Sequence, residues 1–269
     1  MPLIFDIKRH ALEDGPGIRT TVFFKGCNLR CVWCHNPESI DSAAEIGFYP
    51  SCCINCGDCE RICPSSACSL SNPDRIQRDK CTRCGDCVKA CPALALRLIG
   101  RYYPVDELID ILLRDRVYYE VSGGGVTFSG GEPTLYIDYL SAVLHRLKEL
   151  GIHTAIQTNG CFEWARFEAE LLDMVDLVML DLKLAESEEH RRYTGRPNQA
   201  ILENLGHLAR QKKAALIPRI PHVPRITDNK GNLNKLGSIL QGFGINAAIL
   251  PYNPLGISKW KTIGKHLPA

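Results

Sequence analysis

The stretch FFKGCNLRCVWCHNPES, Phe23 to Ser39, holds three cysteines and no fourth beside them. Cys27, Cys31 and Cys34 follow the spacing C-x3-C-x2-C. A closed structural zinc site takes four protein ligands, so this motif would need a distant fourth ligand to form one. Three thiolates on a cubane iron–sulfur cluster instead leave one iron open to a small molecule, as a reactive metal centre requires. The spacing therefore favours a [4Fe–4S] cluster with an open iron.

The composition is that of an ordinary globular protein. Of 269 residues, 45% are hydrophobic and 23% are charged, which suits one large domain or one domain with an insert. The formal net charge is +2 and no basic run is longer than QKK at 211–213, so nothing indicates nucleic-acid binding. No apolar run approaches the roughly 20 residues that cross a bilayer, and the N-terminus lacks the apolar core of a secretory signal. We expect a cytoplasmic protein that binds neither nucleic acid nor membranes.

Fourteen cysteines need an explanation in such a chain. Disulfides are rare in a reducing compartment, and eleven of the cysteines lie in three tight runs, the opening motif and two more. CINCGDCERICP, Cys53–Pro64, and CTRCGDCVKACP, Cys81–Pro92, repeat the spacing C-x2-C-x2-C-x3-C-P. This is the run of bacterial two-cluster ferredoxins, in which the fourth cysteine of each run binds the other cluster.

We therefore predict two further [4Fe–4S] clusters within residues 49–99. The expected ligands are Cys53, Cys56, Cys59 and Cys91 for the first cluster, and Cys81, Cys84, Cys87 and Cys63 for the second. A pair of zinc sites is the alternative, but zinc sites usually separate two C-x2-C pairs by a longer span and do not end in C-P. Cys52, Cys68 and Cys161 are left over, and we expect them to be buried or inert thiols, although Cys52 could compete with Cys53.

Outside this insert, short apolar runs alternate with amphipathic stretches, which is typical of β-then-α units. The predicted strands are 20–25, 126–129, 153–158, 177–182, 215–220 and 247–250. The predicted helices are 105–115, 136–151, 162–174, 198–211 and 232–243, with a further helix expected around the opening motif. A doubly wound sheet and a partial barrel both satisfy this α/β pattern, and in both the ligands bind at the carboxyl ends of the strands. We expect one discontinuous domain, residues 1–48 and 100–269, interrupted by the insert at 49–99.

The three-cysteine motif resembles that of the radical S-adenosylmethionine (radical SAM) enzymes, and VTFSGGEPTL (126–135) is similar to the family's segment for the methionyl amine of SAM. Four more pieces narrow the resemblance to the glycyl radical enzyme activating enzymes, the relatives of pyruvate formate-lyase activating enzyme. They are EDGPGIRTTVFFKGCNLRCVWCHNP (13–37), VSGGGVTFSGGEP (121–133), VMLDLK (178–183) and ILPYNPLG (249–256). The match covers the chain apart from the insert, and relatives with a two-cluster ferredoxin insert at this place form a subset. The resemblance implies a partial (β/α)6 TIM-like radical SAM barrel with an inserted ferredoxin-like domain.

The resemblance also implies the chemistry. SAM chelates the open iron, and one electron from a reduced ferredoxin or flavodoxin cleaves its sulfonium to give a 5′-deoxyadenosyl radical. That radical abstracts hydrogen from a backbone glycine of a partner glycyl radical enzyme, and the activating protein is expected to be a monomer. A maturase or small-molecule radical SAM enzyme with auxiliary clusters is the alternative, against which the activase signatures weigh. A plain ferredoxin-type electron carrier would have no use for a three-cysteine cluster.

A set of SAM contacts follows from the same resemblance, without a separate catalytic residue. Gly130, Gly131 and Glu132 would meet the methionyl amine. Asp181 and Lys183 would contact the methionyl end of SAM, Lys183 by pairing with its carboxylate. The other implied contacts are Trp33 and His35 on the adenine side, Thr158, Arg219 and Asn253. Trp33 could instead pack in the core, and Arg219 could be a solvated strand-end charge.

Two positions depart from the family pattern. Gln157 replaces an aspartate that, with the positions matching Met179 and Asp181, forms a monovalent-cation site near SAM in pyruvate formate-lyase activating enzyme. A neutral amide brings no charge to a hard cation, which puts this cation site in question. Asn253 stands where that relative has a histidine, so a hydrogen bond to SAM survives there and a titratable group does not.

Overall fold

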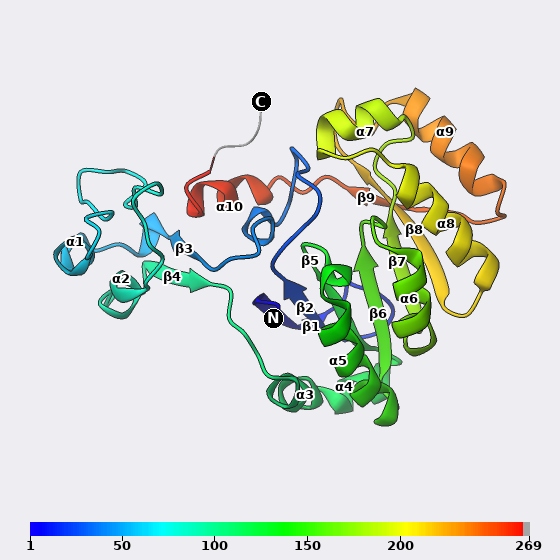
Figure 1. Ribbon diagram of the computed structural model, residues 1–269, viewed down its shortest axis with the longest axis horizontal. Coiled ribbons are helices and arrows are strands. Elements are labelled where there is room, and N and C mark those ends of the chain that lie inside the picture. The colour runs from blue at the N-terminus through cyan, green and yellow to red at the C-terminus, as the bar shows by residue number, and fades with distance from the viewer. Residues whose placement is uncertain (266–269) are drawn as a thin grey trace.

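Seven strands form the central sheet, in the order β1-β2-β5-β6-β7-β8-β9 (Figure 1). The computed structural model describes residues 1–265, so the last four residues of the predicted barrel domain lie outside the described part. The parallel strands are β2 (Arg19–Phe24), β5 (Gly125–Gly130), β6 (His153–Thr158), β7 (Leu177–Asp181), β8 (Ala215–His222) and β9 (Ala248–Pro251). These are the strands that the sequence predicts, with ends that differ by at most two residues. β1 (Ile4–Ala11), which pairs antiparallel with β2, is not among the predicted strands.

The strands of the central sheet differ in how deeply they are buried. β2, β5, β6 and β7 are buried along nearly their whole length, as expected for parallel strands that are covered on both faces. β8 and β9 expose much of theirs, and within residues 1–265 β9 pairs only with β8. The sheet is curled and stays open between β9 and β1 (Figure 1), which fits a partial barrel.

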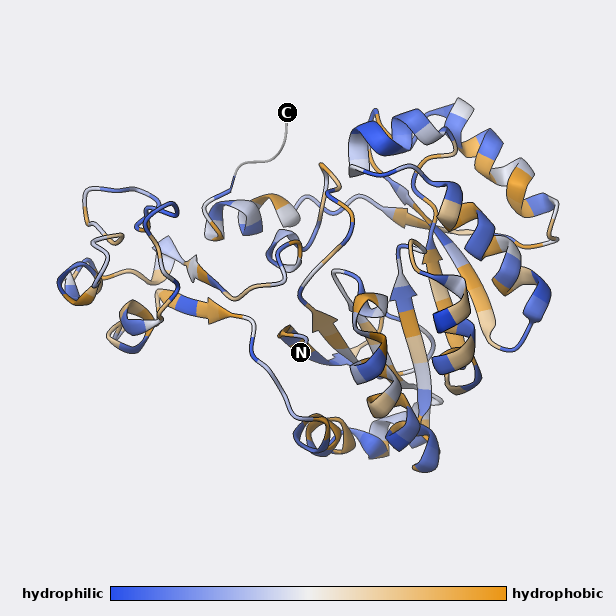
Figure 2. Cartoon of the chain, viewed as in Figure 1, coloured by the Kyte–Doolittle hydropathy of each residue, from blue (hydrophilic) through white to orange (hydrophobic). Residues whose placement is uncertain are grey.

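Helices cover the outer side of the curled sheet (Figure 1). The predicted helices correspond to α3 (Val105–Leu113), α5 (Ile137–Glu149), α6 (Trp164–Glu170), α8 (Gln199–Gln211) and α9 (Lys230–Gln241). Their apolar side chains share one core with the strands, and Figure 2 shows apolar residues gathered along the sheet. Between residues 1 and 265, no helix has the length and the apolar content that a membrane crossing requires.

The structure corrects the prediction of a helix around the opening motif. Only the 3-10 turn η1 (Pro37–Ser39) follows the cysteines. Asn36 precedes Pro37 and has φ −121° and ψ 63°, because a residue before proline is driven away from the helical region. Outside the insert, the helices between β2 and β5 are instead α3 and α4 (Arg116–Ser122). α7 (Ser187–Thr194) and α10 (Gly256–Thr262) are also absent from the prediction.

The insert stands to one side of the barrel (Figure 1) and has its own two-stranded sheet. β3 (Glu45–Phe48) pairs antiparallel with β4 (Leu96–Ile99). This sheet therefore begins a few residues before the insert boundary expected from the sequence. α1 (Asp58–Ile62) and α2 (Asp86–Lys89) each lie within one of the two cysteine runs.

Candidate functional site

A cavity of about 430 Å³ opens at the carboxyl ends of the parallel strands, where ligands bind in folds of this kind. The three cysteines of the opening motif line it. The predicted SAM contacts that also line it are Trp33, His35, Gly130, Gly131, Thr158, Asp181, Lys183, Arg219 and Asn253. Glu132 is the predicted contact that does not line it. The fold thus brings residues from 33 to 253 into one place.

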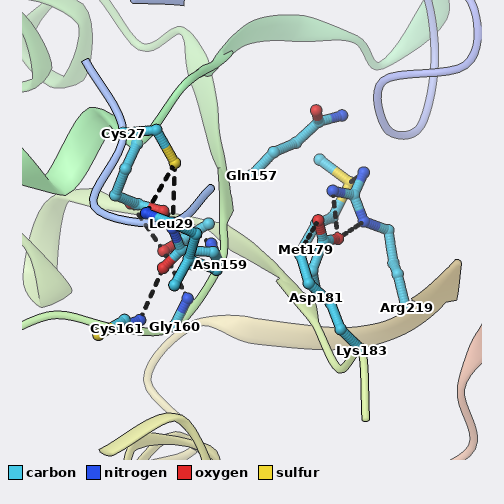
Figure 3. Close-up of polar contacts among 12 residues, drawn as sticks. Cys27, Leu29, Gln157, Asn159, Gly160, Cys161, Met179, Asp181, Lys183 and Arg219 are labelled. Carbon is cyan, nitrogen blue, oxygen red and sulfur yellow. Dashed lines mark hydrogen bonds and ion pairs between the residues drawn. The ribbon is translucent and has the colours of Figure 1, made fainter. Parts of the chain in front are cut away.

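The cysteine loop is held from two sides. The backbone N–H groups of Arg30 and Val32 donate to the carbonyls of Thr194 and Tyr193, at 2.7 and 3.0 Å, so the end of α7 fixes its middle. The Cys27 Sγ accepts from Leu29 N at 3.4 Å and from Asn159 Nδ2 at 3.6 Å (Figure 3).

These thiols fit the ligands of an iron–sulfur cluster. Burial raises the pKa of Cys27 to about 12 and also raises the pKa of Cys31 and of Cys34. Buried thiols of this kind carry their protons until a metal displaces them, and N–H donors to sulfur stabilise the thiolate that results. Among residues 1–265, no three His, Cys, Asp or Glu side chains converge on a point that a single metal ion could occupy. A cubane instead takes one thiolate for each iron atom that the protein binds.

Three charged side chains form what we call the Asp181 ion group, namely Asp181, Lys183 and Arg219 (Figure 3). The Lys183 Nζ donates to Asp181 Oδ2 at 3.1 Å, and Arg219 donates to Oδ1 from Nε at 2.9 Å and from Nη2 at 2.7 Å. Asp181 and Arg219 are direct partners in the β7–β8 register. Two cations against one carboxylate leave one excess positive charge within the Asp181 ion group, which favours an anionic ligand group beside it.

Both charges of the Asp181–Lys183 pair persist despite burial. Burial alone would raise the pKa of Asp181, but the charges of Arg219 and Lys183 outweigh it and hold the pKa below its ordinary value. Burial alone would lower the pKa of Lys183, but the charge of Asp181 raises it above the ordinary value. The pair is therefore ionised throughout the neutral range.

Glu132 supports the wall of the cavity from behind. Its carboxylate is fully buried and accepts from Thr134 N, Thr134 Oγ1, Thr158 Oγ1 and Asn159 N at 3.2, 2.7, 2.8 and 2.7 Å. Burial raises the pKa of Glu132, and these donors offset part of that rise. The carboxylate thus joins the turn after β5 to the end of β6, and its predicted contact with the methionyl amine stays a prediction.

Gln157, Met179 and Asp181, the three positions of the monovalent-cation site discussed above, contact other side chains of this chain. Gln157 Nε2 donates to Asp14 Oδ1 at 2.9 Å, and Gln157 Oε1 accepts from Ser129 Oγ at 2.6 Å. The Arg219 guanidinium lies beside both Asp181 and Met179, with Nη1 4.0 Å from the Met179 sulfur (Figure 3). A cation of the protein itself therefore stands next to the two residues that match that site.

Sequence reasoning did not assign several residues of this site. Asp14 and Glu13 line the cavity, and both belong to the EDGPG motif, which was the available signal. α10 packs on the cysteine loop, where Trp260 Nε1 donates to the Cys34 carbonyl at 3.1 Å. Lys259 reaches Asn36 Oδ1 at 2.8 Å. A local sequence pattern does not predict contacts between segments that lie near opposite ends of the chain.

The two cysteine runs of the insert adopt the same backbone conformation. Gly57 and Gly85 have φ of 82° and 84°, and each begins the short helix of its run. Phe48, before the first run, pairs with Leu96, after the second. Ile76, before the second run, pairs with Cys68, after the first. This exchange joins the two halves of the insert, and it accompanies the approach of Cys91, the fourth cysteine of the second run, to the first three cysteines of the first run.

One insert site is visible as a cavity. We call Cys53, Cys56, Cys59 and Cys91 the first insert site, and all four line a small cavity together. We call Cys81, Cys84, Cys87 and Cys63 the second insert site. Cys63 and Cys91 occupy equivalent positions, because their Sγ atoms accept from the N–H of Ala67 at 3.2 Å and of Ala95 at 3.3 Å.

Comparison with known proteins identifies the family. Residues 21–230 match the Radical SAM superfamily. The benzylsuccinate synthase activating enzyme of Thauera aromatica is 38% identical over 277 residues, 98% of this chain and 82% of that protein. The trans-4-hydroxy-L-proline dehydratase activating enzyme of Clostridioides difficile is 40% identical over 270 residues, 98% of this chain and 88% of that protein. Streptococcus suis SuiB, solved bound to the precursor peptide SuiA, aligns with a TM-score of 0.52 at 16% identity over 89% of this chain and 39% of SuiB, a likeness of fold. The chain belongs to the radical SAM superfamily and, within it, to the activating enzymes of glycyl radical enzymes.

Proposed function

We propose that this chain cleaves SAM reductively at a [4Fe–4S] cluster bound by Cys27, Cys31 and Cys34, and so places a radical on a backbone glycine of a partner glycyl radical enzyme. The observation that carries this proposal is the meeting of three thiols, one buried and two half-buried, with the Asp181 ion group in one cavity at the strand ends. The relatives named as activating enzymes, at 38% and 40% identity, support the protein substrate.

The chain's own residues position SAM. When bound, the cluster supplies the electron that splits the sulfonium of SAM. The excess positive charge of the Asp181 ion group would hold the carboxylate of the methionyl part. Trp33 and His35, on the loop that carries the cysteines, would hold the adenine, while Gly130, Gly131, Thr158 and Asn253 form other walls. Glu132 fixes the Thr158 hydroxyl at 2.8 Å, and so orients that wall.

The insert is proposed to hold two more [4Fe–4S] clusters, at the first and second insert sites, which makes three in the chain. The duplicated backbone and the cavity lined by the first site support this assignment. We propose that the insert clusters pass electrons from a reduced ferredoxin or flavodoxin toward the cavity. We further propose that the chain acts as a monomer toward its partner, and that Met179 and Asp181 hold no monovalent cation.

The test uses the anaerobically reconstituted protein and two cysteine variants. The unmodified protein should show a cluster signal in electron paramagnetic resonance that changes when SAM is added, and should form 5′-deoxyadenosine. Cys31→Ala should lose that signal and the product. Cys161→Ala, which removes a thiol that belongs to none of the three runs, should keep both.

The partner class is tested by mixing the reduced protein and SAM with purified glycyl radical enzymes. A glycine-centred doublet should appear with one of them. A reconstituted chain without a SAM-responsive cluster signal, or one whose SAM-responsive signal survives in Cys31→Ala, would contradict the proposed site. SAM cleavage that never produces a glycine doublet, and modifies a small molecule instead, would contradict the proposed substrate.

A further inference from the structure

The internal duplication of the insert is broken at Arg75. Alignment of the two runs pairs Cys53 with Cys81, and the same offset along the chain pairs Gly47 with Arg75. Because Gly47 has no side chain, Arg75 has no counterpart in the other half of the insert. At this position the surroundings of the two insert sites therefore differ.

The Arg75 side chain lies in the first insert site. It is 6% exposed and lines the same cavity as Cys53, Cys56, Cys59 and Cys91. Its Nη2 donates to Asn55 Oδ1 at 2.8 Å and lies 3.7 Å from the Cys53 Sγ. Its guanidinium carbon stands 5.3 Å from the centre of the Phe48 ring.

Two features show that the protein alone does not satisfy this guanidinium. The buried Nε of Arg75 has no hydrogen-bond partner among residues 1–265. Within the same range, no carboxylate forms an ion pair with Arg75. Burying a cation without an anion is unfavourable, so the position calls for a negatively charged occupant with acceptor atoms. Four thiolates around iron and sulfide provide both.

We propose that Arg75 raises the reduction potential of the cluster at the first insert site by donating to its sulfur atoms. This inference rests on the proposed insert clusters. Reduction adds one electron and no proton, so the reduced cluster is more negative by one charge. A buried cation and an N–H···S bond both stabilise that form. The effect is expected at the first site, because Arg75 lines that site and the equivalent position in the other half of the insert is Gly47.

Arg78 is a half-buried arginine of the same region, and its Nε also has no partner among residues 1–265. It differs from Arg75 in that its Nη1 and Nη2 donate to the carbonyls of Ile46 and Thr262, and it does not line the cavity of the first insert site. Arg61, in α1, carries a side chain that is 73% exposed and pairs with Asp58. Arg61 is the matched control. Its charge lies in the same half of the insert but is exposed to solvent, where screening weakens its interaction with a cluster.

The experiment is a potentiometric titration with dithionite, followed by electron paramagnetic resonance, on the full chain. The signal of the SAM cluster is recognised by its response to SAM, and the signal of the first insert site by its loss in Cys56→Ala. In Arg75→Gln, the ratio of reduced to oxidised cluster at a fixed potential should fall about tenfold at the first site, about 59 mV for a one-electron couple. Arg75→Lys, which keeps the charge, should recover part of this loss, and Arg61→Gln should match the unmodified protein.

Iron content separates the two ways to fail. Variants that keep the iron of the unmodified protein and show an unshifted potential at the first site overturn the role of Arg75 alone. If Arg75→Gln loses iron only from the first site, the potential of that cluster is instead compared between Arg75→Lys and the unmodified protein. An unmodified protein with iron for a single cluster, about four atoms per chain, overturns the insert clusters and leaves the SAM site untouched.

Discussion

Gly131 marks the point where the end of β5 meets the cysteine loop. A Cβ at Gly131 would lie 2.1 Å from the Gly26 carbonyl oxygen, and one at Gly130 would lie 2.2 Å from the Phe24 nitrogen. Gly130 also has φ of 116°, a region that other residues rarely adopt. The resemblance implies that this glycine pair meets the methionyl amine of SAM. The approach that requires glycine in the structure is to the chain's own backbone, directly before Cys27, and both glycines also line the cavity.

Lys183 carries the excess positive charge of the site. Lys183→Gln leaves Asp181 balanced by Arg219 alone, so the Asp181 ion group becomes neutral where the carboxylate of SAM is expected. Losing one partner of a buried charged contact should weaken SAM binding roughly 30-fold. The measurement is a SAM titration of the cluster signal. Lys235→Gln, which removes an exposed lysine paired with Glu186, should bind SAM as the unmodified protein does, and equal affinities for both variants would exclude this role of Lys183.

Arg219 makes a second residue-scale prediction, on cations. Its guanidinium already lies beside Asp181 and Met179, and Gln157 is engaged with Asp14 and Ser129. Replacing Na⁺ and K⁺ by tetramethylammonium at constant ionic strength should therefore leave the rate of 5′-deoxyadenosine formation unchanged. A rate that collapses in tetramethylammonium and returns with K⁺ would show that a cation binds here after all.

α10 is the element that couples the cysteine loop to the C-terminal part of the chain. It meets the loop at Gly256, where a Cβ would lie 2.9 Å from the His35 Cα, and again at Trp260, which donates to the Cys34 carbonyl. Both contacts fall on the loop that carries the proposed cluster ligands. The position of α10 therefore controls how that loop sits over the cavity.

Gly256→Ala tests this coupling. The added methyl group must push helix and loop apart, because the nearest atom it meets belongs to the backbone. We expect a loss of about 1–3 kcal/mol in the free energy of unfolding, measured by thermal unfolding, and a weaker response of the cluster signal to SAM. Gly237→Ala is the control, since Gly237 in α9 has no atom within 4 Å of an added Cβ and the exchange there should be neutral or slightly stabilising. Identical behaviour of the two variants would remove α10 from the site.

The sequence predicts those helices and strands whose buried apolar residues recur at a regular spacing. β7 begins with the apolar run LVML, and α5 buries Leu140, Val143, Leu144 and Leu147 on one face. β1 escapes prediction because it is an antiparallel edge strand with four exposed residues. α7 escapes because it is polar and buries little (Figure 2).

Some features of the candidate site can likewise be predicted from the sequence, and others cannot. Cysteine spacing is local and can be read directly, whereas the side-chain contacts between distant segments cannot. The pairing of Asp181 with Arg219 depends on the β7–β8 register. The bond from Gln157 to Asp14 joins residues that are 143 positions apart. Such contacts follow from how the sheet curls, which no run of residues encodes by itself.

The whole molecule is arranged so that the second half of the insert faces the barrel. Arg83, in the second cysteine run, pairs with Asp41 at 3.5 Å, and Lys265 pairs with Glu45 at 2.8 Å. Arg78 reaches α10, and α10 contacts the cysteine loop through Trp260. The second insert site therefore lies on the side of the insert that is tied to the proposed SAM cluster.

Cys84→Ala tests whether electrons use this arrangement. Cys84 is an exposed member of the second insert site, so its loss should disable that cluster while leaving the barrel folded. If electrons from a ferredoxin or flavodoxin pass through the insert, the variant should cleave SAM far more slowly with the protein reductant. A small reductant such as dithionite reaches the SAM cluster directly and should support an unchanged rate. Cys52 belongs to neither insert site. Cys52→Ala should therefore respond like the unmodified protein to either reductant. If Cys84→Ala cleaves SAM as fast as the unmodified protein with the protein reductant, the relay through the second insert site is excluded, because only a relay makes the effect depend on the electron donor.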